Sequence, residues 1–128
     1  MHTCDGPDAS PPLRATGVPA AAKEVVIVMV DHDAGDFMHW GIAHLAPHAS
    51  IDLPAGAKPA GAVLGRNDFG SLGYRGPCPP SGERAHHYEI TVYALSRPSM
   101  LKPGFSAGAV TGLPALATGR LTGRYARR

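Results

Sequence analysis

The stretch EVVIVMVDHDAGDFMHWGIAHL, residues 24–45, decides the fold. Its first part, 24–31, is an almost continuous β-branched run, which is typical of a strand buried on both faces of a sheet. The segment DHDAGD that follows favours a turn, because Asp and Gly favour turns over further strand pairing. Residues 37–45, FMHWGIAHL, predict a second strand. The stretch therefore predicts two strands separated by a turn.

A third strand is predicted at HHYEITVYAL, residues 86–95. Strand alternation places five side chains on one mainly apolar face, namely those of His86, Tyr88, Ile90, Val92 and Ala94. We expect this face to line the core, so that His86 and Tyr88 lie at its entrance. The strand follows a loop rich in proline and glycine, residues 73–85.

The rest of the chain is richer in turn formers. SPPL at 10–13 predicts an extended segment, and residues 46–66, rich in Ala, Pro and Gly, predict a long surface loop with at most a short strand. Residues 96–112 also have loop composition. Several short strands with Gly/Pro turns predict a mainly β fold, an antiparallel β-sandwich.

The end of the chain predicts one short helix and a last strand. LPALATG, residues 113–119, predicts the helix, because Pro114 suits a first helical turn and Gly119 suits a helix end. RLTGRYARR, residues 120–128, predicts a final strand with a basic end. No repeat and no domain boundary interrupt residues 1–128, so a single domain is expected.

Composition excludes several classes of protein. The chain has 128 residues, 44% of them hydrophobic, with 16 Gly and 13 Pro, which predicts a folded core with many turns. The formal net charge of +2 does not indicate a nucleic-acid partner. No apolar run reaches the ~20 residues that span a bilayer. The opening MHTCDGPDAS lacks the basic and then apolar order of a secretory signal, so a cytoplasmic protein is expected.

The two cysteines, Cys4 and Cys78, have neither CxxC spacing nor a regular zinc pattern. They are predicted to be free thiols in a reducing cytosol, with a single bridge between them as the alternative. No nucleotide-binding glycine motif follows a strand. GSLG at 70–73 does not complete a GxSxG nucleophile motif, because Phe69 stands where the first glycine is required.

Polar residues at strand ends indicate a binding pocket. Asp31 and Asp33 end the first buried strand, His39 lies in the second strand, and His86 begins the third. If these ends meet, a carboxylate and two imidazoles converge beside apolar walls. A protonated histidine donates a charge-assisted hydrogen bond to a phosphate oxygen, and the carboxylate orients an imidazole or accepts a proton from the ligand's hydroxyl. The residues therefore predict a site for a small phosphate-like anion.

The proline-rich loop has a role in this prediction. Gly76, Cys78 and Pro79 each precede a proline and are restricted to extended geometry, so the loop forms a rigid wall that loses little entropy on binding. Two histidines and one carboxylate, His39, His86 and Asp31, also form a possible metal set, although no spacing selects a metal. Neither a metal nor a cofactor is predicted.

Several motifs together resemble the phosphatidylethanolamine-binding protein family, in its bacterial branch of Raf-kinase-inhibitor-like proteins. They occur in the family's order: SPPL (10–13), VDHDAGDFMHW (30–40), NDFGSLGYRGPCPPSGERAHHYEITVYAL (67–95), and the ending LATGRLTGRYARR (116–128). The resemblance implies a β-sandwich with a short C-terminal helical element and a pocket for phosphate-like head groups.

The resemblance also implies site residues. The family's aspartate motif falls on Asp31 and Asp33, its strand histidine on His39, and the histidine of its last motif on His86, with Tyr88 two residues later. The Gly/Pro-rich loop of the family falls on GPCPPSG, which implies that Cys78, Pro79 and Pro80 line the pocket.

Three departures from the family pattern bear on these expectations. His32 stands where proline is usual, which predicts a looser turn after Asp31. His87 stands where arginine is common, which predicts the loss of a salt-bridge partner for the Asp31–Asp33 turn. Relatives also begin with a further strand before CDG, so here we expect either that a sheet edge is exposed or that something else covers it, and pairing of that edge in a homodimer is one possibility.

We therefore expect a non-enzymatic protein that binds a phosphate or phosphoethanolamine-like ligand. The alternative is a regulatory interaction protein that inhibits a kinase or protease, which family members have been associated with, although no segment of this sequence identifies the target. A metal-dependent enzyme is a third interpretation.

Overall fold

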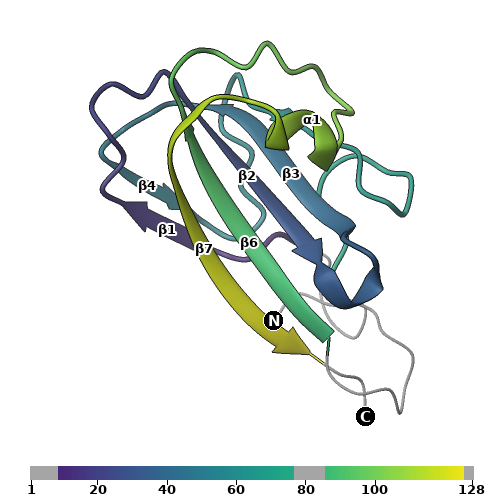
Figure 1. Ribbon diagram of the computed structural model, residues 1–128. Coiled ribbons are helices and arrows are strands. Elements are labelled where there is room, and N and C mark those ends of the chain that lie inside the picture. The colour runs from purple at the N-terminus through teal and green to yellow at the C-terminus, as the bar shows by residue number, and fades with distance from the viewer. Residues whose placement is uncertain (1–8, 77–85, 126–128) are drawn as a thin grey trace.

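The computed structural model describes residues 9–76 and 86–125, and for His86 and residues 122–125 it describes the backbone alone. The strands of this part of the chain form two antiparallel sheets (Figure 1). The smaller sheet pairs β1 (Leu13–Thr16) with β4 (Ser50–Leu53). The larger sheet has the order β5-β3-β2-β6-β7, with the bounds Val63–Leu64, Phe37–Leu45, Glu24–Asp31, His86–Leu95 and Ala115–Tyr125.

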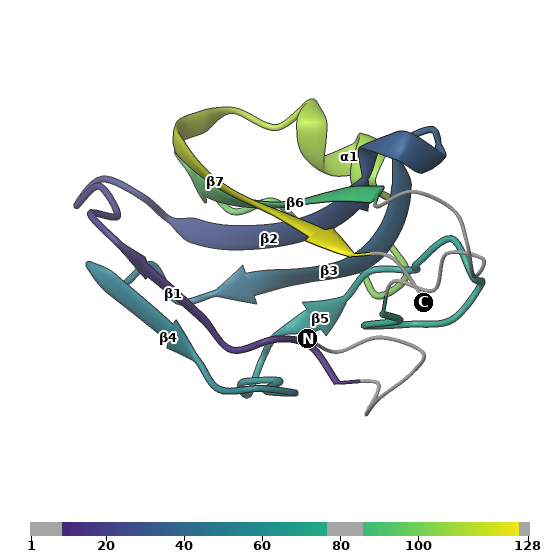
Figure 2. The same cartoon turned by 90° about the horizontal axis from the view of Figure 1, so that it is seen from below.

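Strand β2 is the centre of the larger sheet and is buried on both of its faces, as its continuous apolar run predicts. One face carries the inner core, which lies between the two sheets and includes Val25, Ile27 and Met29 of β2. The other face carries the outer core, in which Val26 and Val28 pack with α1 (Ala107–Thr111) and the loop before it. Figure 2 shows the smaller sheet and α1 on opposite sides of the larger sheet.

Two β-bulges shape β3. In the pairing with β2, Met29 faces Trp40 and Val30 faces Met38, which leaves His39 as the extra residue. A second irregularity lies between Val25 and Ile27, where His44 of β3 adopts a positive φ of 62°. Bulges re-aim side chains and are frequent beside functional sites. Both histidines of β3 thus lie at irregular points of the strand.

The structure confirms the predicted fold class and the bounds of three strands. An antiparallel β-sandwich with one short helix is observed, and β2, β3 and β6 cover residues 24–31, 37–45 and 86–95 as predicted. The extended segment predicted at SPPL leads into β1. A strand was also predicted for the last residues, and β7 extends to Tyr125.

Three other predictions were wrong. The expected helix over 113–119 is largely β-strand, because residues 115–125 pair along β6, and that pairing outweighs the local Pro and Gly signals. The helix instead occupies 107–111, within the expected loop 96–112, where Ser106 Oγ accepts from the Ala109 backbone as an N-cap. The expected loop 46–66 contains two strands, β4 and β5.

Candidate functional site

The buried imidazole of His39 is the centre of the candidate site. Its side chain is in the core, with a residue exposure of 3%, and its Nδ1 lies 2.7 Å from the Arg75 carbonyl oxygen. A carbonyl oxygen only accepts, so Nδ1 carries a proton and donates it. The Arg75 backbone N–H donates in turn to the His39 carbonyl at 2.9 Å. The first bond orients the ring and the second holds the Arg75 main chain against β3, so a proton that the neutral ring gains binds at Nε2.

Three aromatic rings surround the His39 imidazole. The ring centroids of Phe37, Phe69 and Tyr88 lie 5.2, 5.5 and 5.5 Å from that of His39. The Arg75 guanidinium lies over the outer ring of this group, with Cζ 5.1 Å from the centroid of Phe69. The site thus combines three aromatic rings packed around a buried imidazole with a permanent cation at its outer edge.

Tyr88, whose ring contacts this imidazole, lies beside Asp31. They are cross-strand partners of β2 and β6, and both residues are 3% exposed. Asp31 Oδ1 accepts from the Asp33 backbone N–H at 2.9 Å, which caps the 3-10 turn η1 (His32–Ala34). Of the residues that the sequence predicts for the site, Tyr88 is therefore a neighbour of His39 by ring contact and of Asp31 by strand pairing.

Asp33 takes a different role. Its Oδ2 accepts hydrogen bonds from the His87 backbone N–H and from His87 Nδ1, the latter at 2.8 Å. The expectation that His87 deprives this turn of a partner was therefore wrong, because the imidazole provides the contact itself.

His32 does not loosen the turn either. Its Nδ1 lies 2.7 Å from Asp36 Oδ1 and its Nε2 lies 3.1 Å from Glu89 Oε1, so the ring joins both ends of the turn to β6. These hydrogen bonds, chiefly that to Asp36, raise the pKa of His32 above 6.5. The looser turn expected from the missing proline is thus not observed.

A buried asparagine organises the loop that carries Phe69 and Arg75. Asn67 is 1% exposed, and its Nδ2 donates to Ser71 Oγ and to the Gly73 carbonyl at 2.9 and 3.1 Å. Its Oδ1 accepts from the backbone N–H groups of Phe69 and Ser71. Asp68 joins the loop to β3, since its Oδ2 accepts from Met38 N at 2.7 Å. The sequence analysis did not identify Asn67, although NDFGS, residues 67–71, is a typical Asx-turn sequence.

A second buried polar cluster lies at the opposite end of β2. Glu24 is 3% exposed and accepts from the backbone N–H of His44, from the backbone N–H and hydroxyl of Ser99, and from His44 Nδ1. Burial alone raises the pKa of Glu24, but the hydrogen bonds from Ser99 and His44 outweigh it and hold that pKa below 4.5. His44 Nε2 lies 2.6 Å from the Leu101 carbonyl oxygen. This cluster anchors the 96–106 loop rather than the site around His39.

The remaining predicted site residues are described only in part. His86 pairs with Tyr125 at the start of β6, and its side chain lies outside the described residues. Cys78, Pro79 and Pro80, the predicted wall of the pocket, also lie outside them, as does Cys4. Among the side chains that the structure describes, no group of three or more His, Cys, Asp or Glu is placed to hold a metal ion.

Trp40 packs in the inner core against Tyr74, with ring centroids 6.2 Å apart. In the part of the chain that the structure describes, no helix is long and apolar enough to cross a membrane.

Comparison with known proteins identifies relatives of the whole chain. Residues 1–126 match the family described as Phosphatidylethanolamine-binding protein. A UPF0098 protein of Pyrococcus horikoshii is 43% identical over 114 residues, which is 82% of this chain and 57% of that protein. A candidate lipoprotein of Mycobacterium tuberculosis, LppC, is 40% identical over 81% of this chain and 52% of its own length. The chain thus spans somewhat more than half the length of these relatives.

One solved structure confirms the fold. The crystal structure of Escherichia coli YbcL, described as a member of the mammalian family of these proteins, superposes with a TM-score of 0.87 at 33% identity. The superposition covers 99% of this chain and 88% of YbcL.

Proposed function

The chain belongs to the phosphatidylethanolamine-binding protein family, and from this premise and the geometry around His39 we propose that it binds a small phosphate-type anion without catalysing a reaction. The observation that carries the proposal is the fixed orientation of the buried His39 ring. Because Nδ1 donates to the Arg75 carbonyl, protonation at Nε2 adds a charged donor without moving the ring.

The surroundings of His39 favour an anion with a proton of its own. Phe37, Phe69 and Tyr88 provide a partly apolar setting, in which a charge-assisted hydrogen bond is stronger than in water. The carboxylate of Asp31 repels a fully ionised ligand but accepts a hydrogen bond from a ligand hydroxyl. A phosphate monoester that keeps one proton therefore satisfies both groups, while Arg75 adds positive charge at the rim.

Titration calorimetry at two pH values tests the proposal. We expect phosphoethanolamine to bind at about pH 5.5, and inorganic sulfate, which has no proton to donate to Asp31, to bind more weakly than phosphoethanolamine at this pH. Both anions should bind much more weakly at about pH 8, because the imidazolium loses its proton between these values. Sulfate is the control for the ligand's own titration, since its charge is constant over this range. Equal sulfate affinity at the two values would contradict a protonated-imidazole donor, and no binding of either anion at the lower value would contradict the proposed function.

A further inference from the structure

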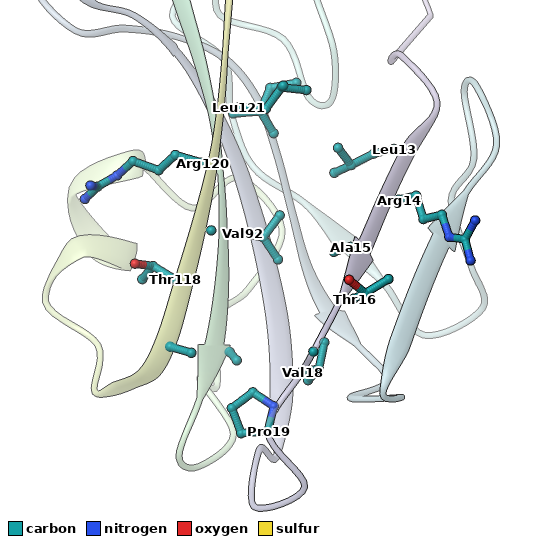
Figure 3. A pocket seen from close by; sticks show the side chains of 15 residues that line it. Leu13, Arg14, Ala15, Thr16, Val18, Pro19, Val92, Thr118, Arg120 and Leu121 are labelled. Carbon is teal, nitrogen blue, oxygen red and sulfur yellow. The ribbon is translucent and has the colours of Figure 1, made fainter.

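A groove of about 370 Å³ lies between the two sheets, separate from the residues around His39. Its floor is the inner face of β6, with Ile90, Val92 and Ala94. One side is formed by residues 117–121 of β7, and the other side by residues 13–19 of β1 and the turn that follows it (Figure 3).

Small side chains create the groove. On the inner face of β7, Ala117 pairs with Ala94, and Gly119 pairs with Val92. A Cβ atom added at Gly119 would meet no atom within 4 Å. The smaller sheet has two described strands and ends at β1. Neither of these strands covers this part of the inner face of β6 and β7.

The main chain of β1 borders this groove. Every residue from Leu13 to Pro19 lines it, including Arg14, whose side chain points away from it (Figure 3). Among the described strands β1 pairs with β4 alone, and Figure 3 shows β4 on the side of β1 that faces away from the groove. The other edge of β1 thus faces an apolar groove. A strand edge beside a hydrophobic groove is the arrangement used for β-strand addition.

We propose that this groove binds an extended segment of a partner protein, which adds to the edge of β1 opposite β4 as a further strand beside the two described strands of the smaller sheet. Alternate apolar side chains of the segment enter the groove over Val92, Ala94 and Gly119. The added strand lies about 4.8 Å from β1 and about 10 Å from the larger sheet, as sheets of a sandwich do.

The charge of Arg14 favours acidic residues at those positions of the partner segment whose side chains point away from the groove. Arg14 lies on the solvent face of β1, where its cross-strand neighbour on β4 is Asp52. An acidic residue of the added strand would flank Arg14 on the other side, and opposite charges on neighbouring strands stabilise pairing. The partner segment therefore alternates apolar and acidic residues. An acyl chain would fill the groove but would give the β1 edge no hydrogen-bond partner.

Fluorescence anisotropy with two labelled peptides tests the inference. The probe has about eight residues that alternate valine and glutamate, and the control peptide has the same composition in two blocks. We expect the alternating peptide to bind at least about tenfold more tightly than the block peptide. Gly119→Val, which fills the groove, should weaken that binding by at least about tenfold, whereas Thr118→Val on the opposite face of the same strand should not.

The design separates this inference from the proposed function. Gly119→Val and a second groove-filling variant, Ala117→Val, leave the residues around His39 in place, so both variants should keep the phosphoethanolamine binding of the wild type, which also shows that they are folded. Equal binding of the two peptides, or unchanged peptide binding in both filled variants, would overturn the inference. Two other outcomes would also overturn the inference. If neither peptide bound, and the wild type bound cis-parinaric acid while the filled variants did not, the groove would bind a lipid. If neither peptide bound, and the wild type self-associated while the filled variants did not, the groove would bind a second copy of the chain.

Discussion

His39 and Tyr88 place their ring centroids 5.5 Å apart although they belong to strands on opposite sides of β2. Strands two positions apart in a sheet are separated by about 10 Å, so the two side chains meet across the end of β2. Asp31 is the last residue of β2 and the cross-strand neighbour of Tyr88. Tyr88 thus has two neighbours where the central strand ends, His39 by ring contact and Asp31 by strand pairing.

Replacement of His39 tests the role of its charge. Glutamine offers an amide N–H to the Arg75 carbonyl but never becomes a cation. We expect His39→Gln to weaken phosphoethanolamine binding at about pH 5.5 by about tenfold to a hundredfold, because a hydrogen bond to a charged group contributes about 1.5–3 kcal/mol. The measurement is calorimetry on both proteins.

His44→Gln is the matched control for this variant, since His44 lies at the other β3 irregularity and contacts Glu24, away from the aromatic rings around His39. This control should bind the anion as the wild type does. Equal losses of binding in the two variants would show that the effect comes from damage to β3 and not from the site.

The sequence predicted β2, β3 and β6 to the residue because each is a hydrophobic or alternating segment that turn formers precede or follow. β7 differs: Ala115–Tyr125 contains two alanines and two glycines, which are weak strand formers, and it is a strand because it pairs with β6 along nearly its whole length. The local sequence of residues 115–125 does not indicate this pairing with β6. The same limitation explains why β4 and β5 were missed within an Ala/Pro/Gly-rich segment.

The site was predicted in part for a related reason. His39 and Tyr88 were identified from strand ends and family motifs, but strict alternation would place His39 and Trp40 on opposite faces of β3. The bulge removes that alternation, since His39 contacts Tyr88 of the inner core, to which Trp40 also belongs. Asn67 and Glu24 were missed because their hydrogen-bond partners come from loops that only the tertiary structure places.

Asn67 should be important for stability. Asn67→Ala removes the side-chain bonds to Ser71, Gly73 and Phe69 and leaves their backbone groups without this partner. We expect the free energy of unfolding to fall by about 2 kcal/mol, the cost of unsatisfied buried polar groups. Urea denaturation measures it. Ser71→Ala, which removes a hydroxyl but leaves the asparagine bonds to the backbone, should have a clearly smaller effect, and equal effects would contradict the central role of Asn67.

Glu24 should stabilise the fold in a pH-dependent manner. Glu24→Gln places an amide NH₂ group against donors from His44 and Ser99, so we expect a loss of about 2–3 kcal/mol at neutral pH. The folded-state pKa of Glu24 lies below its ordinary value of 4.5. Its stabilising effect is therefore complete above about pH 4.5 and is lost as the pH falls through the folded-state pKa. Unfolding curves from neutral pH to about pH 3 measure the difference between the two proteins, which should shrink on acidification.

The exposed Asp52→Asn variant is the control for Glu24→Gln, because it removes a carboxylate from the surface of β4. It should change stability by less than about 1 kcal/mol. A difference between wild type and Glu24→Gln that stayed constant down to the lowest pH would contradict a stabilising role for the ionised carboxylate.

His32 should have the opposite pH dependence. Its pKa is raised above 6.5 by Asp36 and Glu89, so the protonated ring stabilises the folded state fully below about pH 6.5, and this contribution is lost as the pH rises through the folded-state pKa. His32 is about half exposed, so we expect no more than about 1 kcal/mol. Thermal unfolding of wild type and His32→Gln should show a stability difference near pH 6 that disappears near pH 9, while His48→Gln, in an exposed loop, should show none at either value. A stability difference between wild type and His32→Gln that grew with rising pH would contradict this prediction. It would mean that the neutral form of His32 makes the stabilising contacts, and that ion pairs to Asp36 and Glu89 do not stabilise the turn after Asp31.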